Sequence, residues 1–199
     1  MKVFLTIACL LLSANAVYAL PAESTVDTTD AANILEARAN LPGLNALQTK
    51  YAKAIIAQAK KDGVGAYGCQ IAIVTGITEV VIFYLAFVNY ESANSFSKTN
   101  LMMSANKAVP SSMKFPHDRV GTNGDAVGIF QQPASIYKNV PCDMNAACSA
   151  GQLYREIKKI QGWKNMDITT ICQKTHYSNC DQYTERVGLA TNVCKAGGL

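Results

Sequence analysis

The stretch that decides the fold is Cys69-Gln70-Ile71-Ala72-Ile73-Val74-Thr75-Gly76-Ile77-Thr78-Glu79, an apolar segment that ends in a carboxylate. Its length and its content of Ala and Ile predict a buried helix, although several of its residues are β-branched. Burial would draw Glu79 toward an apolar environment, disfavour the charged form of its carboxyl group and raise its pKa. A carboxyl group that keeps its proton near neutral pH can serve as a general acid, so Glu79 is the candidate catalytic residue. The alternative is a glutamate that simply reaches water from the end of an ordinary helix.

Residues 1–19 have the features of a secretory signal peptide. Lys2 is followed by an apolar run over residues 3–12 and then by small residues suited to cleavage. The run is too short to span a bilayer, and polar sequence follows it. We therefore expect a secreted, extracellular protein. Residues 20–43 are acidic and poor in apolar side chains, which predicts a disordered leader or pro-segment.

The remaining residues, 44–199, suffice for one domain with a hydrophobic core. Sixteen of the 18 Lys and Arg residues, but only ten of the 14 Asp and Glu residues, lie in this part of the chain. The resulting net charge of +6 suits an anionic polymer as partner. Nucleic acid is not expected, because the chain carries a signal peptide and has no basic run. We expect a monomer.

Six cysteines follow the signal peptide, which in an exported chain predicts up to three disulfides. They are Cys69, Cys142, Cys148, Cys172, Cys180 and Cys194. The sequence leaves their pairing open, apart from a local pairing of Cys142 with Cys148. No metal site and no cofactor are expected, because the chain has no Cys-x-x-Cys and its two histidines are far apart in sequence.

Apolar residues at helical spacing between Leu44 and Ala59, among them Leu47 and Tyr51, predict a first helix that ends at Gly63. Residues 63–68 are interpreted as a turn. Ser149 and Gln152 predict a capping box at the start of a helix that stops at Gly162. Asp167 predicts the cap of a further helix, and residues 100–124 predict a long loop region. The expected fold class is therefore mainly α.

The apolar segment continues past Glu79 into a run rich in strand formers, and the whole run from Ile71 is of roughly membrane length. Gly76 and the central Glu79 argue against a membrane span, because a carboxylate at the bilayer centre costs about 2.5–3.5 kcal/mol or more.

The order of these features resembles the lysozyme-like superfamily, specifically the soluble lytic transglycosylase-like domains of secreted fungal type. The resemblance covers roughly residues 44–194. It rests on the apolar helix before Glu79, on Asn100-Leu101, on Asp125-Ala126-Val127-Gly128-Ile129-Phe130-Gln131-Gln132-Pro133, on residues 149–154 with 162–166, and on Gln173 with Tyr183. It implies a single lysozyme-like domain with long cleft loops that is stapled by disulfides.

The resemblance also implies an activity on β-1,4-linked amino-sugar polymer such as bacterial peptidoglycan, a cell-wall polysaccharide. Glu79 would protonate the glycosidic oxygen. In a transglycosylase the substrate's own hydroxyl can close an anhydro ring, so a second carboxylate is not obligatory. If hydrolysis occurs instead, Asp125 and Asp118 are the available second carboxylates, and the alternative for both is a loop turn or a helix cap.

The cleft segment is expected to hold the sugar. Gly128 would allow close backbone approach, Phe130 would pack beneath, and Gln131 and Gln132 would offer amide groups to hydroxyl and acetamido groups. The alternative for the glutamines is a solvated turn. The full set of expected substrate-binding residues is Asn100, Asp125, Gly128, Phe130, Gln131, Gln132, Gln173 and Tyr183.

Two departures from the family pattern favour an alternative function. Pro133 directly follows Gln132, where relatives usually have an Arg between them, and residues 176–180 match the family poorly. The alternative is a catalytically weak or inactive wall-glycan binding protein or competition factor.

Glu91 is the alternative catalytic acid, because Glu91-Ser92 also resembles the Glu-Ser pair of relatives. Removing residues 80–98 joins Glu79 directly to Thr99-Asn100-Leu101, which restores the family continuation. This piece begins with Val, whose codons begin with GT, and ends with Lys, one of whose codons ends in AG. We therefore predict that residues 80–98 are a non-native insertion from a retained intron; the alternative is a real insertion that brings Glu91 to the cleft.

Overall fold

The structure is a computed structural model that describes residues 40–85, 101–122, 124–176, 184 and 186–199. The expected signal peptide and most of the leader lie outside these residues, as do Glu91, Asn100, Cys180 and Tyr183. Within them the chain is mainly helical, with two short sheets and two disulfides. The predicted class, mainly α with disulfides, is therefore confirmed.

The longer helices are α2 (Ala46–Lys61), α3 (Gly65–Leu85), α7 (Ala146–Lys159), α8 (Ile168–His176) and α10 (Val187–Ala196). The short helical elements are η1 (Pro110–Lys114), α5 (Ala134–Tyr137), α6 (Val140–Asp143) and η2 (Trp163–Asn165). The strands are β1 (Ser104–Asn106), β2 (Arg119–Gly121), β3 (Ala126–Val127) and β4 (Gln132–Pro133).

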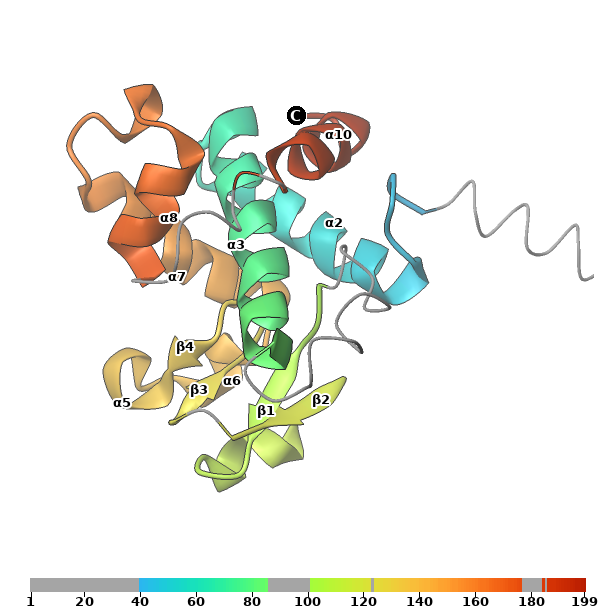
Figure 1. Ribbon diagram of the computed structural model, residues 1–199, viewed down its shortest axis with the longest axis vertical. Helices are drawn as coiled ribbons and strands as arrows, with labels where there is room; N and C mark the ends of the chain where they lie inside the picture. The colour runs from blue at the N-terminus through green and yellow to red at the C-terminus, as the bar shows by residue number, and fades with distance from the viewer. Residues whose placement is uncertain (1–39, 86–100, 123, 177–183, 185) are drawn as a thin grey trace, which may run out of the picture.

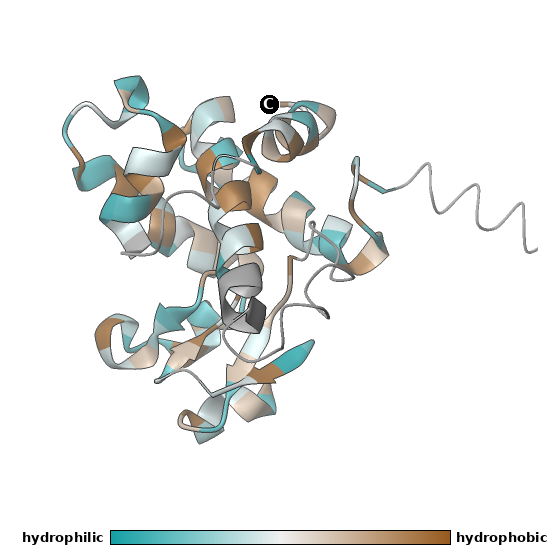
Figure 2. Cartoon of the chain, in the orientation of Figure 1, coloured by the Kyte–Doolittle hydropathy of each residue, from teal (hydrophilic) through white to brown (hydrophobic). Residues whose placement is uncertain are grey.

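Helix α3 is the central element of the fold. It contacts α2, α7, α8 and α10, and Figure 1 shows it running through the middle of the molecule with α8 on one side and α10 on the other. Ile71, Ile73 and Ile77 are completely buried. Hydrophobic residues gather where α2, α3 and α10 meet (Figure 2). The deciding stretch therefore forms the buried helix that its composition predicts.

The bounds of α3 differ from the prediction at both ends. The helix begins at Gly65, so residues 65–68 of the expected turn at residues 63–68 are helical. Gly63 and Gly65 adopt φ angles of +65° and +66°, which glycine tolerates without steric cost, and these two residues make the connection from α2. The helix also continues past Glu79 to Leu85, because the apolar residues after Glu79 extend it. Glu79 therefore lies within a helix and does not end one.

Helix α2 begins with a capping box. The Asn45 side chain accepts a hydrogen bond from the backbone N–H of Gln48, and the Gln48 side chain accepts one from the backbone N–H of Asn45. It ends before Gly63, as predicted. Its buried face includes Ile55 and Ile56, whereas Leu47 is 45 % exposed. Leu47, one of the residues whose spacing predicted this helix, therefore does not face the core.

Helix α7 begins earlier than predicted. The side chain of Asn145 accepts hydrogen bonds from the backbone N–H groups of Ala147 and Cys148, at 3.1 and 3.0 Å, and so caps the helix. Ser149 is therefore inside the helix, and Gln152 is not part of a capping box. At the start of α8, Asp167 Oδ1 accepts from Thr170 N at 2.8 Å, which confirms the predicted cap.

The segment with the two glutamines forms a hairpin, in which β3 and β4 are antiparallel and Ala126 is paired with Pro133. A second sheet pairs β1 and β2 in parallel. Gly128 N donates to Ser104 O at 2.8 Å, which joins the hairpin to β1. We call residues 125–133 the cleft hairpin.

Two disulfides are formed among the described cysteines. Cys142 pairs with Cys148, as expected from their spacing, and Cys69 pairs with Cys194 across 125 positions. Cys172 is a buried free thiol, which contradicts its expected place in a disulfide. Its sulfur lies 3.3 Å from Thr75 Oγ1 on α3, and α3 and α8 enclose it. Among the described helices, none combines the length and the hydropathy that a membrane span requires.

Candidate functional site

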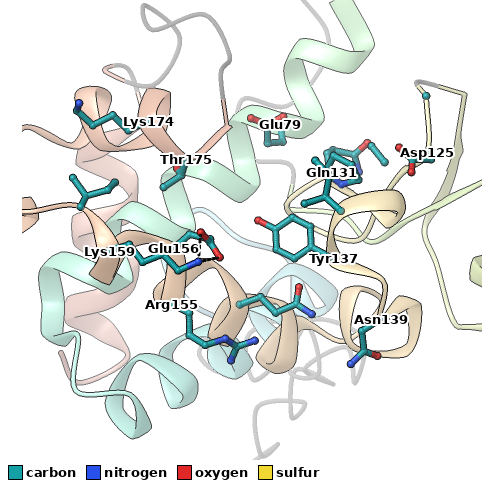
Figure 3. Close-up of a pocket in the computed structure, with 16 residues that line it drawn as sticks. Glu79, Asp125, Gln131, Tyr137, Asn139, Arg155, Glu156, Lys159, Lys174 and Thr175 are labelled. Carbon is teal, nitrogen blue, oxygen red and sulfur yellow. Dashed lines mark hydrogen bonds and ion pairs between the residues drawn. The ribbon is translucent and has the colours of Figure 1, made fainter.

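A pocket of about 1110 Å³ lies between α3, the cleft hairpin, α5, α7 and α8. Figure 3 shows that its labelled side chains come from elements far apart in sequence. Its lining includes Glu79, Asp125, Gln131, Ile136, Tyr137, Asn139, Gln152, Arg155, Glu156, Lys159, Lys174 and Thr175. Three of the residues predicted for the site, Glu79, Asp125 and Gln131, thus share one pocket.

Glu79 is half-buried and lies at the pocket wall on α3. The turns of α3 before it are buried, and Thr78 beside it is completely buried. In Figure 3 the Glu79 side chain lies between Thr175 of α8 and Gln131 of the cleft hairpin. Burial raises the pKa of the Cys172 thiol to about 12, and the nearby Glu79 charge contributes to the rise. The arrangement places a carboxyl group at the boundary between the apolar core and the pocket.

Gln131 is held in an unusual conformation in the turn between β3 and β4. Its φ is +48°, a region that side-chain-bearing residues rarely adopt, and it is only 8 % exposed. Its Nε2 donates to Gly128 O at 2.8 Å, which fixes the orientation of the amide. Its Oε1 is buried and receives no hydrogen bond from any described residue. Gln131 therefore lines the pocket with a side chain whose amide is held by its own turn.

Gln132 does not line the pocket. It is completely buried, and its Nε2 donates to Ser149 O at 3.4 Å, which ties β4 to α7. The expected sugar contact is therefore wrong for this residue. Gln132 is the first residue of β4 and points its side chain toward α7, whereas Gln131 lies in the turn before the strand and lines the pocket.

Gly128 and Phe130 have structural roles. Gly128 has a φ of +81°, and a methyl group at its Cα would lie 2.1 Å from the backbone oxygen of Asp143. The close approach that Gly128 permits is thus to α6 and not to a sugar. Phe130 is completely buried, as expected for a residue that packs beneath the hairpin.

Asp125 is the second carboxylate of the predicted set at the pocket. Its Oδ2 accepts from Ser135 N at 2.6 Å, and hydrogen bonds from Ser135 lower the pKa of Asp125. The carboxylate is therefore ionised at neutral pH. Asp118, the other candidate, accepts from Tyr51 OH at 3.2 Å and from Met103 N at 2.7 Å and does not line the pocket. Its role is to join the loop before β2 to α2 and β1.

Gln173 of α8 is half-exposed and is not part of the pocket lining. Asn100 and Tyr183, the other predicted sugar contacts, lie outside the described residues. Among the residues that the structure describes, no cluster of three or more His, Cys, Asp and Glu side chains could hold a metal ion.

Several residues of the pocket were not predicted from the sequence. Tyr137 on α5 faces the space beside Gln131 in Figure 3, and burial raises the pKa of its hydroxyl, as do the charges of Glu156 and Asp143. Gln152 on α7 is 6 % exposed, and its Oε1 also receives no hydrogen bond from a described residue. Tyr137 belongs to no motif of the sequence analysis, and Gln152 was interpreted there as part of a helix cap and of the family-like stretch 149–154, not as a pocket residue.

The rim of the pocket is formed by charged side chains of α7 and α8. Arg155, Lys159 and Lys174 supply cations, and Lys159 forms a 2.8 Å ion pair with Glu156. The exposed fractions of the two paired side chains are 69 % and 40 %, so water weakens this pair. The pocket thus combines two largely buried glutamine side chains with a rim that carries charges of both signs.

Asp143 lies behind the pocket wall, next to the close contact with Gly128. It is completely buried, and burial raises the pKa of its carboxyl group from 3.8 to about 6. The Gln152 side chain opposes this shift. Among the described carboxylates, only that of Asp143 has both oxygens buried and without a hydrogen-bond donor within bonding geometry.

Comparisons with known proteins give no assignment for this chain: no protein-family model matches it, and no curated protein is similar to it in sequence.

Proposed function

We propose that the protein cleaves β-1,4-linked amino-sugar polymer such as bacterial peptidoglycan, with Glu79 as the general acid. One observation carries the proposal: a carboxyl group on the buried central helix lies in the same pocket as Gln131, an amide held by the cleft hairpin. Converging polar groups in a concave site are what a ligand pocket uses to orient its ligand. The signal peptide expected from residues 1–19 suits an extracellular polymer.

The proposed reaction begins with proton transfer from Glu79 to the glycosidic oxygen as the bond to the sugar breaks. Asp125, whose carboxylate is ionised, is suited to stabilise positive charge on the sugar ring or to activate a water molecule. In the transglycosylase form of the reaction, a hydroxyl of the same sugar attacks the anomeric carbon and returns a proton to the carboxylate. The two forms differ in whether water enters the product.

The test is to incubate the secreted protein with purified peptidoglycan and to analyse the soluble fragments. Anhydro-ended fragments indicate transglycosylation, and reducing ends indicate hydrolysis. Sedimentation of the protein with the polymer without fragment release supports the second function, a glycan binding protein without turnover. No binding and no fragments would refute both.

The matched control compares two carboxylates of the same pocket. Glu79→Gln should lower fragment release by about 10²- to 10⁴-fold, the usual contribution of a positioned general acid. Glu156→Gln, which changes a rim carboxylate paired with Lys159, should leave release within a few-fold of the unmodified protein. Equal losses in the two variants would indicate a general effect of pocket charge.

A further inference from the structure

The two disulfides within the described part of the chain differ in how far solvent reaches them. Cys69 and Cys194 are completely buried, and their bond joins α3 to α10. Cys148, in the first turn of α7, is exposed, and its partner Cys142 on α6 is 6 % exposed. Thiol–disulfide exchange requires a thiolate to reach one sulfur of the bond. Of these two disulfides, the bond between Cys142 and Cys148 is therefore the one open to attack in the folded protein.

A surface groove of about 630 Å³ gives access to this bond. Both Cys142 and Cys148 line the groove, and Lys61 and Arg155 bring positive charge to it. Such charge favours the approach of a thiolate anion. The carboxylate of Asp62, which accepts from the Gln58 side chain at 2.9 Å beside the groove, offsets part of this charge.

The groove and the candidate site share two residues. Asn139 and Arg155 line both of them, and Figure 3 shows these two side chains at the lower edge of the candidate site. The side chain of Asn139 also accepts from Cys142 N at 3.2 Å and so caps α6. The helix that carries Cys142 therefore adjoins the wall between the disulfide and the candidate site.

Helix α6 also supports the cleft hairpin. The backbone oxygen of Asp143, the residue after Cys142, lies so close to Gly128 that a methyl group there would be 2.1 Å from it. Gly128 N donates to Ser104 O at 2.8 Å, which joins the hairpin to β1. Because α6 is only four residues long, it is not stable on its own, and the disulfide fixes it to α7. The support of the hairpin thus depends in part on this bond.

We propose that the Cys142–Cys148 disulfide is a thiol-exchange site that reacts with a dithiol, with Cys148 as the attacked residue, and that its opening loosens the cleft hairpin while the fold persists. The bond spans six positions and the Cys69–Cys194 bond spans 125. In the chain-entropy account, a disulfide that closes a short loop stabilises the native state less than one that closes a long loop. The inference is independent of the ligand that the candidate site takes.

The exchange proceeds in two steps. A thiolate of the dithiol attacks Sγ of Cys148, and the bond to Cys142 breaks. Its electron pair goes to Sγ of Cys142, which takes a proton from water, and a mixed disulfide remains at Cys148. The second thiolate of the dithiol then attacks the reagent sulfur of the mixed disulfide and releases Cys148 as a thiolate. The protein disulfide is reduced by two electrons, and the dithiol is oxidised to a cyclic disulfide.

The first experiment treats the full chain with dithiothreitol at increasing concentration for a fixed time, alkylates free thiols and identifies each labelled cysteine by peptide mass spectrometry. Cys142 and Cys148 should be labelled at a concentration about ten-fold lower than Cys69 and Cys194. Cys172, a buried free thiol, should stay unlabelled at that concentration, because its labelling reports unfolding. The inference is overturned if the Cys142–Cys148 pair opens no earlier than the other pair, or only together with labelling of Cys172.

Single substitutions identify the attacked residue. Cys142→Ser leaves the exposed thiol of Cys148, and Cys148→Ser leaves the largely buried thiol of Cys142. With Ellman's reagent as the probe and the modified peptide as the readout, Cys148 in the first variant should react about ten-fold faster than Cys142 in the second. Equal rates would contradict the assignment of Cys148.

Hydrogen exchange measured by NMR tests the link to the hairpin. Protein opened with dithiothreitol and alkylated is compared with untreated protein, and a Cys142→Ser/Cys148→Ser variant gives the open state without the bulk of the label. The amide of Gly128 should exchange several-fold faster in the open state, whereas that of Ala52, completely buried on α2, should keep its rate. Unchanged exchange at Gly128, or equal acceleration at Ala52, would overturn the link. If the double variant does not fold, the alkylated protein still decides.

Discussion

Gly76 of α3 lies directly against Ile129 of the cleft hairpin. A methyl group at Gly76 would lie 2.9 Å from Cγ2 of Ile129 and 2.7 Å from Cδ1 of Leu101, both shorter than a normal contact. The helix and the hairpin therefore approach each other only because residue 76 has no side chain. Since Gly76 is less than one helical turn before Glu79, this contact sets the spacing between the proposed acid and Gln131.

Gly76→Ala should both destabilise the protein and reduce catalysis. Overpacking of this kind typically costs about 1–3 kcal/mol, and a displaced hairpin would move Gln131 away from Glu79. Urea unfolding measures the first effect, and fragment release from peptidoglycan per folded molecule measures the second. Gly188→Ala in α10 is the control, because a methyl group there meets nothing within 4 Å, and it should be neutral or stabilising. Normal turnover by a destabilised Gly76→Ala protein would show that the contact does not position the acid.

Substitutions of the adjacent residues Gln131 and Gln132 should have different effects, one on ligand binding and the other on stability. Gln132→Ala removes a completely buried amide that donates to Ser149 O, so we expect a loss of about 1–3 kcal/mol in unfolding free energy. Gln131→Ala should mainly weaken glycan binding, because Gln131 lines the pocket and Gln132 does not. Denaturant titration of both variants measures the free energy of unfolding, and ligand titration measures the affinity for the glycan. Equal loss of ligand affinity in the two variants would contradict the finding that Gln131 lines the pocket and Gln132 does not.

Asp143 should make the protein less stable as the pH rises through about 6. Burial raises the pKa of its carboxyl group from 3.8 in the unfolded chain to about 6 in the native state, so the native state binds the proton more tightly. The stability that this group contributes is complete below pH 3.8 and is lost as the pH rises through about 6. The shift corresponds to about 2–3 kcal/mol.

Asp143→Asn removes this titration and should flatten the loss of stability between pH 4 and pH 6, the range given by the pKa values of Asp143. The comparison requires urea unfolding of both proteins at several pH values, because other carboxylates contribute to each curve separately. Only the difference between the two curves reports on residue 143. A constant difference across the range would show that Asp143 titrates normally in the native state.

The prediction that residues 80–98 come from a retained intron can be tested on the transcript. If it is a retained intron, the dominant transcript should lack its codons, and the protein without these residues should cleave peptidoglycan through Glu79. Sequencing of the transcript measures the first point. A dominant message that contains the codons, and a secreted protein that contains the residues, would refute the intron prediction.

The choice between Glu79 and Glu91 needs three variants. Glu79→Gln should lower cleavage by about 10²- to 10⁴-fold in the full-length chain and in the form without residues 80–98, whereas Glu91→Gln in the full-length chain should have little effect. An inactive short form, together with a full-length form that depends only on Glu91, would identify Glu91 as the acid. The continuation of α3 to Leu85 makes the first part of the segment helical and leaves this choice open.

The parts of the fold that the sequence predicted are those in which one physical signal dominates. The central helix follows from eleven residues that are rich in Ala, Ile and Val, and the cap of α8 follows from Asp167. The start of α7 was missed because Asn145 and Ser149 are both good caps, and in the structure Asn145 is the one that caps the helix. Propensity alone cannot decide between two adequate caps.

The candidate site was predictable only where its residues share a local motif. Gln131 belongs to the cleft hairpin, and its neighbourhood with Gly128 and Phe130 made it conspicuous. Gln152 and Tyr137 reach the pocket from α7 and α5, and their contribution depends on how these helices pack against the hairpin. The mistaken sugar contact of Gln132 has the same origin, because the sequence does not state which of two adjacent residues points inward.

The disulfide between Cys69 and Cys194 links the first turns of α3 to α10 across 125 positions. During synthesis, the central helix is made early and its covalent partner late, so nearly the whole domain must have emerged before the bond can close. Until then α3, the most apolar element described, depends on noncovalent contacts or on helper proteins to stay out of aggregates. Glu79 is therefore translated early, but the helix that carries it is covalently linked to the rest of the fold only after α10 has been made. The pocket is then among the last parts of the fold to be stabilised by this disulfide.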